Sequence, residues 1–383
     1  MKTSTQVLSL VAAAGILVSA CSSGAATPAP ATQAPATAAP ATAAPASAAP
    51  ASAAPASAAA SVAASAAAFG CTAPAGFAPV WYASAAHPYF ETVKPGVEAA
   101  GKEFGFTPIE QIGPDWTQDS ENQGLEALFA KGSKYFSVYP SDASGANALY
   151  KELTSKGASI INFGASTQQP TTASLVFATD VKAAAMQATE ALIAQMGDKG
   201  NIINVLEVLT DPNTALRKQG VEEVVAKHPN VKIIQEISGM ASQQDAVQKV
   251  TDAIAANSNT VDGIIATGFT PTVAIAQVMT DYKAKGGTRT IHSVGIDTDP
   301  TVVKAISDGV MDGTISQNPF GHGYLPMLAL MCMADGYKVK SGVYAVDTGT
   351  AFVTKANLTT YADDISKVTD KIKASMLTDI LTK

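Results

Sequence analysis

Ten short apolar runs alternate with longer segments of helical periodicity across residues 76–383. Most of the runs are almost unbroken stretches of Val, Ile, Phe, Tyr and similar residues, a pattern typical of parallel strands covered on both faces. The runs are APVWYASA, TPIEQIG, YFSVYP, SIINFGA, SLVFAT, NIINVLEV, VKIIQEIS, DGIIATG, TIHSVGI and GTISQ. Such alternation predicts an α/β fold, either doubly wound or closed into one barrel of eight units. Because the ten runs show no single closing rhythm, we expect two doubly wound parallel-sheet lobes.

The first 20 residues read as a secretory signal peptide. Lys2 is followed by a short apolar core that ends in small residues and is too short to cross a bilayer comfortably. The sequence LVSAC at residues 17–21 resembles the lipobox of bacterial lipoproteins, which implies cleavage before Cys21 and acylation of its thiol. An ordinary signal peptide with a cysteine near its cut site is the alternative. We therefore expect an extracytoplasmic protein that is anchored to a membrane by lipid at Cys21.

Residues 21–70 are a low-complexity segment of alanine, proline, serine and threonine. They carry no charge, and the first aromatic residue among them is Phe69. A segment without a core of its own cannot offset the entropy cost of ordering its backbone. Proline at every fifth position favours an extended chain. We expect a disordered tether that joins the membrane anchor to a folded cargo.

Charge and cysteine content narrow the partners and the chemistry. The net charge is −7 and no basic cluster is present, which argues against nucleic acid as a partner. Cys71 and Cys332 could form a disulfide in an exported protein, but Cys332 lies in the apolar helical run MLALMCMADG. That position favours a buried free thiol.

Enzyme motifs are missing from the sequence. It contains no G-x-S-x-G elbow, P-loop, dinucleotide fingerprint or H-E-x-x-H motif, and its four histidines lack the spacing of a metal site. We therefore expect no cofactor and no metal, and an exported enzyme is a remote alternative.

Function should lie just after the strand-like runs, because ligands of open parallel sheets bind beyond the carboxyl ends of the strands. Polar groups and aromatic rings occupy these positions, a mixture that suits a small polyhydroxylated ligand. The candidate ligand-binding residues are His87, Tyr89, Phe90, Trp116, Ser166, Arg217, Phe269, Asp297 and Gln317.

Several charged or aromatic residues near these ends have competing structural explanations. Asp299 precedes a proline and predicts a helix cap, which leaves Asp297 as the ligand contact. Arg217 lies near a helix start, where a cation is unfavourable unless a carboxylate or a ligand oxygen partners it. His87 is either a helix cap or part of the site, and Trp116 is either core packing or a wall of the site.

The segment AHPYFETVKPGVEAAGKEFG resembles the first strand and helix of the periplasmic sugar-binding proteins of the ribose- and galactose-binding type. The similarity continues through GPDWTQDSENQGLEALFAKG, YPSDASGANALYKEL, LRKQGVEE, SVGIDTDP and AISDGVMDGTISQNP, and so covers essentially the whole folded part. It implies the type I fold, in which two lobes are joined by a three-segment hinge, here near Asp180, Gln317 and Val346. The implied lobes are residues 76–179 with 318–345 and residues 180–317 with 346–383.

The resemblance also implies roles for the candidate residues. His87, Tyr89 and Phe90 would border the site from the first lobe, Arg217 would clamp ligand hydroxyls from the second, and Asp297 and Gln317 would contact ligand beside the hinge. The sequence departs from the ribose pattern where that family carries an Asp-Arg pair, an asparagine and an Asn-Asp pair. The matching positions here are Gly164-Ala165, Val181 and Gly268-Phe269.

These departures bear on the ligand. The lost hydrogen-bonding groups would leave sugar hydroxyls unpaired, so ribose is a poor candidate, whereas another sugar, a polyol or a less polar molecule stacked on aromatic rings remains open. The resemblance implies a monomer that captures its ligand by closure and delivers it to the permease of an ABC importer. Input to a chemotaxis receptor or sensor kinase is the alternative role.

Overall fold

A computed structural model of the chain describes residues 62, 65, 68–240 and 242–383. The predicted signal peptide, Cys21 and most of the predicted tether lie outside the described residues. Within the described part, all ten predicted runs form strands and two open sheets result, so the two-sheet prediction is confirmed and the single barrel is wrong. No helix among the described residues is long and apolar enough to cross a membrane.

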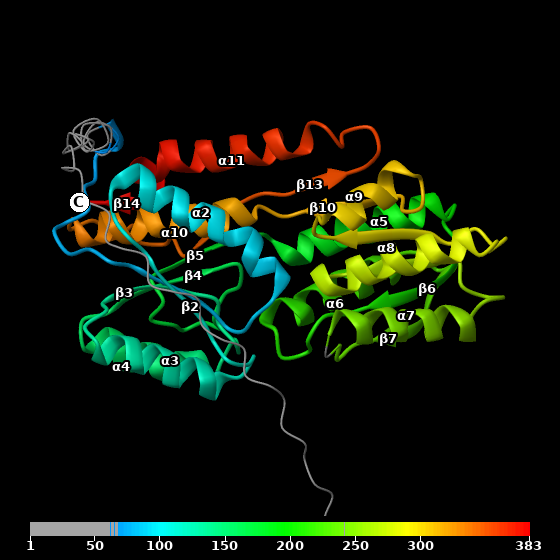
Figure 1. The fold of residues 1–383 in the computed structure, drawn as a ribbon, viewed down its shortest axis with the longest axis horizontal. Helices are drawn as coiled ribbons and strands as arrows, with labels where there is room; N and C mark the ends of the chain where they lie inside the picture. The colour runs from blue at the N-terminus through cyan, green and yellow to red at the C-terminus, as the bar shows by residue number, and fades with distance from the viewer. Residues whose placement is uncertain (1–61, 63–64, 66–67, 241) are drawn as a thin grey trace, which may run out of the picture. The chain divides into compact units, whose positions relative to one another are not determined.

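The first lobe is a six-stranded parallel sheet in the order β12-β5-β4-β3-β1-β2. Its strands are β1 (Val80–Ala83), β2 (Ile109–Ile112), β3 (Tyr135–Val138), β4 (Ser159–Phe163), β5 (Leu175–Ala178) and β12 (Ala345–Asp347). Its helices are α2 (Pro88–Phe104), α3 (Gln118–Ala130), α4 (Ala146–Ser155) and α10 (Pro319–Ala334). Figure 1 shows α3 and α4 on one face of this sheet and α2 and α10 on the other.

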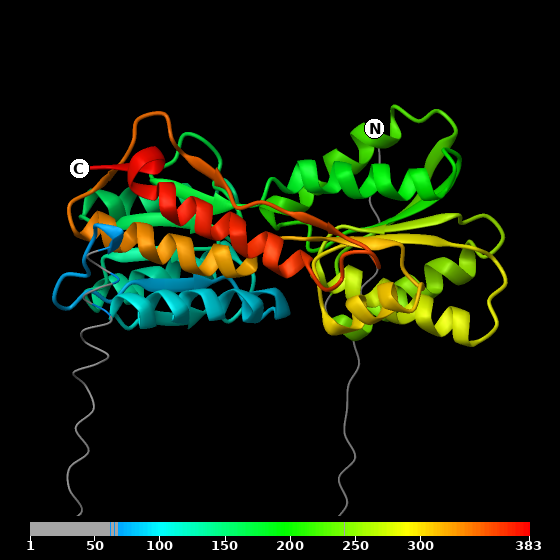
Figure 2. The ribbon, with the colours of Figure 1, turned by 90° about the horizontal axis from the view of Figure 1, so that it is seen from above.

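The second lobe has the same plan, with strand order β13-β10-β9-β8-β6-β7 and β13 antiparallel to β10. Its strands are β6 (Gly200–Val205), β7 (Val231–Ile237), β8 (Gly263–Ala266), β9 (His292–Ile296), β10 (Gly313–Ser316) and β13 (Ala351–Val353). Its helices are α5 (Val181–Gln195), α6 (Pro212–Val225), α7 (Gln243–Ala256), α8 (Phe269–Ala284) and α9 (Pro300–Ser307). In Figure 2 the green helices α5 and α6 lie on one side of this sheet and the yellow helices on the other.

The chain passes between the two sheets at three places. The passages are residues 179–180 after β5, 317–318 after β10 and 348–350 after β12. The first two coincide with the expected hinge positions at Asp180 and Gln317. The third lies just after the expected Val346, because β12 continues the first sheet as far as Asp347.

The expected division of the chain places residues 346–383 in the second lobe, and the structure distributes their elements over both sheets. Only β13 belongs to the second sheet. The chain then returns to α11 (Tyr361–Ser375), which packs against α10, and continues into the π-helix η1 (Met376–Ile380). The last strand, β14 (Leu381–Thr382), pairs with β11 (Lys338–Val339), which directly follows α10. The buried side chains of Ile365, Thr369 and Ile372 on α11 account for this packing.

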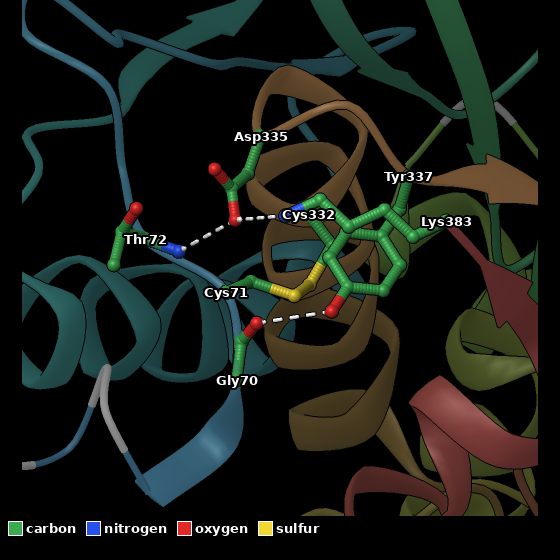
Figure 3. Close-up of a disulfide and its surroundings, with 7 residues drawn as sticks. All are labelled: Gly70, Cys71, Thr72, Cys332, Asp335, Tyr337 and Lys383. Carbon is green, nitrogen blue, oxygen red and sulfur yellow. Dashed lines mark hydrogen bonds and ion pairs between the residues drawn. A yellow bond between two sulfur atoms is a disulfide. The ribbon is translucent and has the colours of Figure 1, made fainter.

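A disulfide joins Cys71 to Cys332, so the expectation of free thiols is wrong (Figure 3). Residues just before and after Cys71 lie against the end of α10. The Gly70 carbonyl accepts a hydrogen bond from the Tyr337 hydroxyl at 3.1 Å, and the Thr72 N–H donates to Asp335 at 3.4 Å. The Phe69 ring contacts the Phe104 ring with centroids 5.4 Å apart. Contacts with the first lobe therefore begin before the expected start at Gly76.

Candidate ligand-binding site

A cavity lies where the carboxyl ends of the strands of both sheets meet. Its empty space is about 430 Å³, including the part that is open to solvent. Eight of the nine predicted residues line it: His87, Tyr89, Phe90, Trp116, Arg217, Phe269, Asp297 and Gln317. The structure thus brings these side chains together from both lobes, and their contact with a ligand stays a prediction.

Ser166 does not line this cavity. The chain turns at Gly164, immediately after β4, where the N–H of Ala165 donates to the Phe163 carbonyl at 2.7 Å. This turn carries Ser166 past the cavity, although it follows the same strand.

Six further residues that were not among the nine candidates line the cavity: Tyr139, Gly164, Glu207, Val208, Asp211 and Asn213. A sequence signal existed for most of them. Tyr139 and Glu207 each lie just beyond the end of a strand, and Asp211 precedes a proline at the start of α6. The same Asp-Pro signal identified the cap Asp299, which the structure confirms through its bond from the Thr301 N–H at 2.7 Å. Asp211 is also a cap, but one that faces the cavity.

Asp297 is held by its backbone and by Gln317. Its φ of 82° lies in the left-handed region, which non-glycine residues rarely adopt and which recurs at binding sites. The Asp297 N–H donates to the Ile315 carbonyl at 2.7 Å, and the Gln317 side-chain amide donates to Asp297 Oδ1 at 2.6 Å. The hydrogen bond from Gln317 thus occupies one of the two carboxylate oxygens of Asp297.

Arg217 projects from α6 and is only 5% exposed. Its nearest ion-pair partner is Asp211, with 3.7 Å between Nη1 and Oδ2. Its Nε atom is buried and has no hydrogen-bond partner among the residues that the structure describes. Buried guanidinium groups normally satisfy their donors, so this Nε–H is a candidate donor to a molecule in the cavity.

Two carboxyl groups in the cavity have raised pKa values. Burial raises the pKa of Glu207 to about 7, although the Thr270 N–H, which donates to it at 2.8 Å, and the charge of Arg217 oppose the shift. Burial likewise raises the pKa of Asp297 to about 6, against the charge of Arg217 and the hydrogen bond from Gln317. Burial thus brings the pKa values of both carboxyl groups close to neutral pH.

The raised pKa of Glu207 predicts a pH dependence of stability. A carboxyl group whose pKa is higher in the folded than in the unfolded state contributes stability below its unfolded pKa of about 4.5, and this contribution is lost as pH rises through about 7. We expect the ligand-free protein to lose stability relative to Glu207→Gln by on the order of 3 kcal/mol between pH 4.5 and pH 8. Urea unfolding of both proteins across this range measures the difference, and parallel curves would contradict the prediction.

Aromatic rings form one wall of the cavity. The Phe90 and Trp116 rings are stacked, with centroids 5.7 Å apart and planes at 25°. The Tyr139 ring meets both edge-on, at 5.1 Å and 5.5 Å. Trp116 therefore both packs against the first lobe and faces the cavity, which unites its two alternative explanations.

His87 also has both of its proposed roles. Its Nδ1 accepts the Tyr89 N–H at 3.2 Å, which caps α2, while Nε2 lies 3.2 Å from the Thr270 hydroxyl and 3.8 Å from Glu207 in the other lobe. Burial lowers the pKa of His87, so the imidazole is neutral at pH 7. A neutral ring that accepts at Nδ1 carries its proton on Nε2 and donates it across the cleft.

A buried hydrogen-bond network links the cavity to the hinge. The Tyr89 hydroxyl lies 2.6 Å from His322 Nδ1, and His322 Nε2 lies 2.8 Å from the Thr348 hydroxyl in the third passage. Asn318, in the second passage, donates to the Thr348 carbonyl at 2.9 Å. Burial and the charge of Arg217 lower the pKa of His322 to about 3, so this ring is neutral. The second and third passages are therefore tied to each other, and the third is tied to the cavity residue Tyr89.

Among the described residues, no group of three or more His, Cys, Asp or Glu side chains is arranged to hold a metal ion.

Comparison with known proteins agrees with this geometry. Residues 77–338 match the family described as "Periplasmic binding protein domain". This chain belongs to the periplasmic binding protein family. The resemblance to type I sugar-binding proteins found in the sequence is thereby confirmed at the level of family and fold.

Curated relatives of this periplasmic binding protein include two sugar- or polyol-binding proteins. The xylitol-binding protein of Mycolicibacterium smegmatis is 26% identical over 214 residues, which are 56% of each chain. The xylose/arabinose-binding protein of Sulfolobus acidocaldarius is 28% identical over 156 residues, 39% of this chain and 36% of the relative. The chain thus spans about half or less of the length of these relatives.

Solved structures share the fold. A solute-binding protein of Burkholderia graminis in complex with D-arabinose has a TM-score of 0.67 at 20% identity, covering 75% of this chain and 98% of the other. One from Bacillus halodurans with bound myo-inositol has a TM-score of 0.66 at 14% identity, covering 76% and 99%. These similarities establish the two-lobed architecture of this periplasmic binding protein.

Proposed function

We propose that this protein captures a small sugar or polyol between its lobes and delivers it to the permease of an ABC importer, acting as an extracytoplasmic monomer anchored by lipid at Cys21. The observation that carries the proposal is that one cavity contains both a hydrogen-bond donor and a hydrogen-bond acceptor. Arg217 offers a buried donor, Nε, that has no acceptor among the described residues, and Asp297 offers a carboxylate oxygen that is not bonded to Gln317, beside a wall of stacked rings. A hydroxyl group both donates and accepts, and the C–H faces of a sugar pack on aromatic rings.

The relatives support this choice of ligand class, since their names specify xylitol, xylose, arabinose and apiose. Export and anchoring rest on the signal peptide, the lipobox and the long Ala/Pro-rich segment of the sequence. Membership of the family, whose named relatives are binding proteins, supports binding without turnover. Delivery of the same ligand to a chemotaxis or sensor-kinase partner is the second candidate, because it requires the same closed form.

A binding screen tests the proposal. The full chain is titrated with xylitol, D-xylose, D-arabinose, D-apiose, myo-inositol and D-ribose in thermal-shift assays and by calorimetry. At 100 times its Kd, a ligand stabilises the folded protein by about 2.7 kcal/mol. We expect stoichiometric binding of at least one probe, weaker binding of ribose, and recovery of the probe unchanged. Absence of binding to every probe, or conversion of a probe to product, would contradict the proposal.

A further inference from the structure

Tyr139 occupies space that any side chain at position 164 would block. Gly164 has a φ of 68°, and a Cβ atom built on it would lie 3.0 Å and 3.1 Å from two ring carbons of Tyr139. A larger residue there would strain the backbone and push the ring away. The glycine that the sequence carries at this position therefore allows the Tyr139 ring to enter the cleft.

The Tyr139 hydroxyl bonds directly to the opposite lobe. It donates to Asp211 Oδ1 at 2.7 Å, and the Asn213 side-chain amide donates to the Tyr139 oxygen at 3.2 Å and to the Gly164 carbonyl at 2.9 Å. Tyr139 and Gly164 belong to the first lobe, whereas Asp211 and Asn213 begin α6 of the second. Burial and the charge of Asp211 raise the pKa of Tyr139, so its hydroxyl stays protonated and donates.

Both sides of this contact are held rigidly. The Tyr139 ring is packed edge-on against Phe90, Trp116 and Phe163, with centroids 5.1 to 5.7 Å apart. Asp211 is fixed as the cap of α6 by the Asn213 N–H at 3.2 Å and the Thr214 hydroxyl at 3.2 Å. Neither partner can swing aside without breaking other contacts. A bound molecule must therefore fit beside the Tyr139 ring while this contact is intact.

We propose that Tyr139 latches the two lobes to each other directly, through its hydrogen bond to Asp211 and not through a bound ligand. We propose further that this latch restricts the ligand to a single sugar or polyol unit. The restriction on ligand size rests on the proposed function, whereas the latch does not. A longer ligand would have to break the hydrogen bond between Tyr139 and Asp211, and a buried hydroxyl and a buried carboxylate would then lose their partners. Because the latch is a direct bond between the lobes, it favours the closed form of the protein even when no ligand is bound.

The latch is tested first without ligand. Spin labels are attached to cysteines that replace Lys156 and Lys285, whose side chains are exposed on the first and second lobes, in the full chain with Cys21→Ser. Double electron–electron resonance measures the distance between the two labels. The distance distribution of the otherwise unchanged protein is compared with that of Tyr139→Phe, which keeps the ring. Because a hydrogen bond to a charged group is lost, we expect the closed-to-open ratio to fall about tenfold in this variant. The distance distribution should shift to longer values.

Tyr150→Phe is the matched control. Its buried hydroxyl also donates to a carboxylate, Glu121 Oε1 at 3.1 Å, but both residues lie within the first lobe. We expect its distance distribution to equal that of the parent protein. An unchanged distribution in Tyr139→Phe, or an equal shift in both variants, would overturn the latch.

Ligand size is tested second, with three pairs of probes: D-xylose and xylobiose, D-arabinose and arabinobiose, and D-glucose and cellobiose. We expect the wild-type chain to bind at least one monosaccharide and no disaccharide, and Tyr139→Ala to gain disaccharide binding. A wild-type chain that binds a disaccharide as tightly as its monosaccharide, or an alanine variant with unchanged selectivity, would overturn the size restriction. A wild-type chain that binds none of the six and none of the sugars and polyols of the binding screen would contradict the proposed function and the restriction that rests on it, and the resonance distances would still decide the latch.

Discussion

Replacing Arg217 by methionine is expected to weaken binding of every sugar and polyol probe by at least about 30-fold, because truncating a buried, hydrogen-bonded charge costs about 2–5 kcal/mol. Methionine keeps much of the buried aliphatic volume of Arg217 but supplies no donors for ligand hydroxyls. The loss of the cation also raises the pKa of Glu207 and Asp297 further, since its charge lowers both. Their protonation limits the cost to the ligand-free protein, whose melting temperature should change by only a few degrees.

Arg289 provides the matched control, because the chain contains two arginines. Its Nη2 lies 2.5 Å from Asp262 Oδ1, and the residue does not line the cavity. Arg289→Met should leave calorimetric affinities unchanged. If Arg217→Met retains wild-type affinity for the probe that binds best, the ligand does not use this cavity.

The architecture could be predicted because it depends on local pattern. Unbroken apolar runs mark strands buried on both faces, and each of the ten runs forms a strand, although the edge strands β2 and β7 are partly exposed. Strand ends then indicate the site, because parallel strands present their carboxyl ends on one side. Asp297 and Gln317 follow β9 and β10 and meet at 2.6 Å in the structure.

Other parts of the site depend on where two distant segments meet, which no local pattern specifies. Asp211 follows the Asp-Pro pattern of a helix cap, and the pattern does not reveal that the capping carboxylate also faces Tyr139 across the cleft. Glu207 lay inside an apolar run, but β6 ends at Val205 and leaves it free to turn into the cavity. Ser166 is the opposite case. It follows a strand, as the candidate residues do, but the turn at Gly164 carries it past the cavity.

The place of the C-terminal helix α11 depends in the same way on segments that are distant in the sequence. Its position on α10 is decided by the return of the chain after β13 and by the pairing of β14 with β11.

Removal of the disulfide is expected to have the largest effect on stability. Cys71 and Cys332 are separated by 261 residues, and a cross-link that closes so long a loop restricts the unfolded chain strongly. We expect Cys71→Ala combined with Cys332→Ala to lower the free energy of unfolding by about 4 kcal/mol, measured by urea unfolding. Both cysteines are fully buried, so the same loss should follow from reduction of the wild-type protein once it has been unfolded.

Ligand affinity of the double variant should stay at the wild-type value. Cys332 lies in the last turn of α10, about 20 Å along the helix axis from the hinge residue Asn318. Cys21→Ser serves as the control for loss of a cysteine, since Cys21 forms no part of this cross-link, and it should unfold at the wild-type urea concentration. A double variant as stable as the wild type, together with no effect of reductant on unfolding, would show that the two thiols are free, as the apolar surroundings of Cys332 in the sequence suggested.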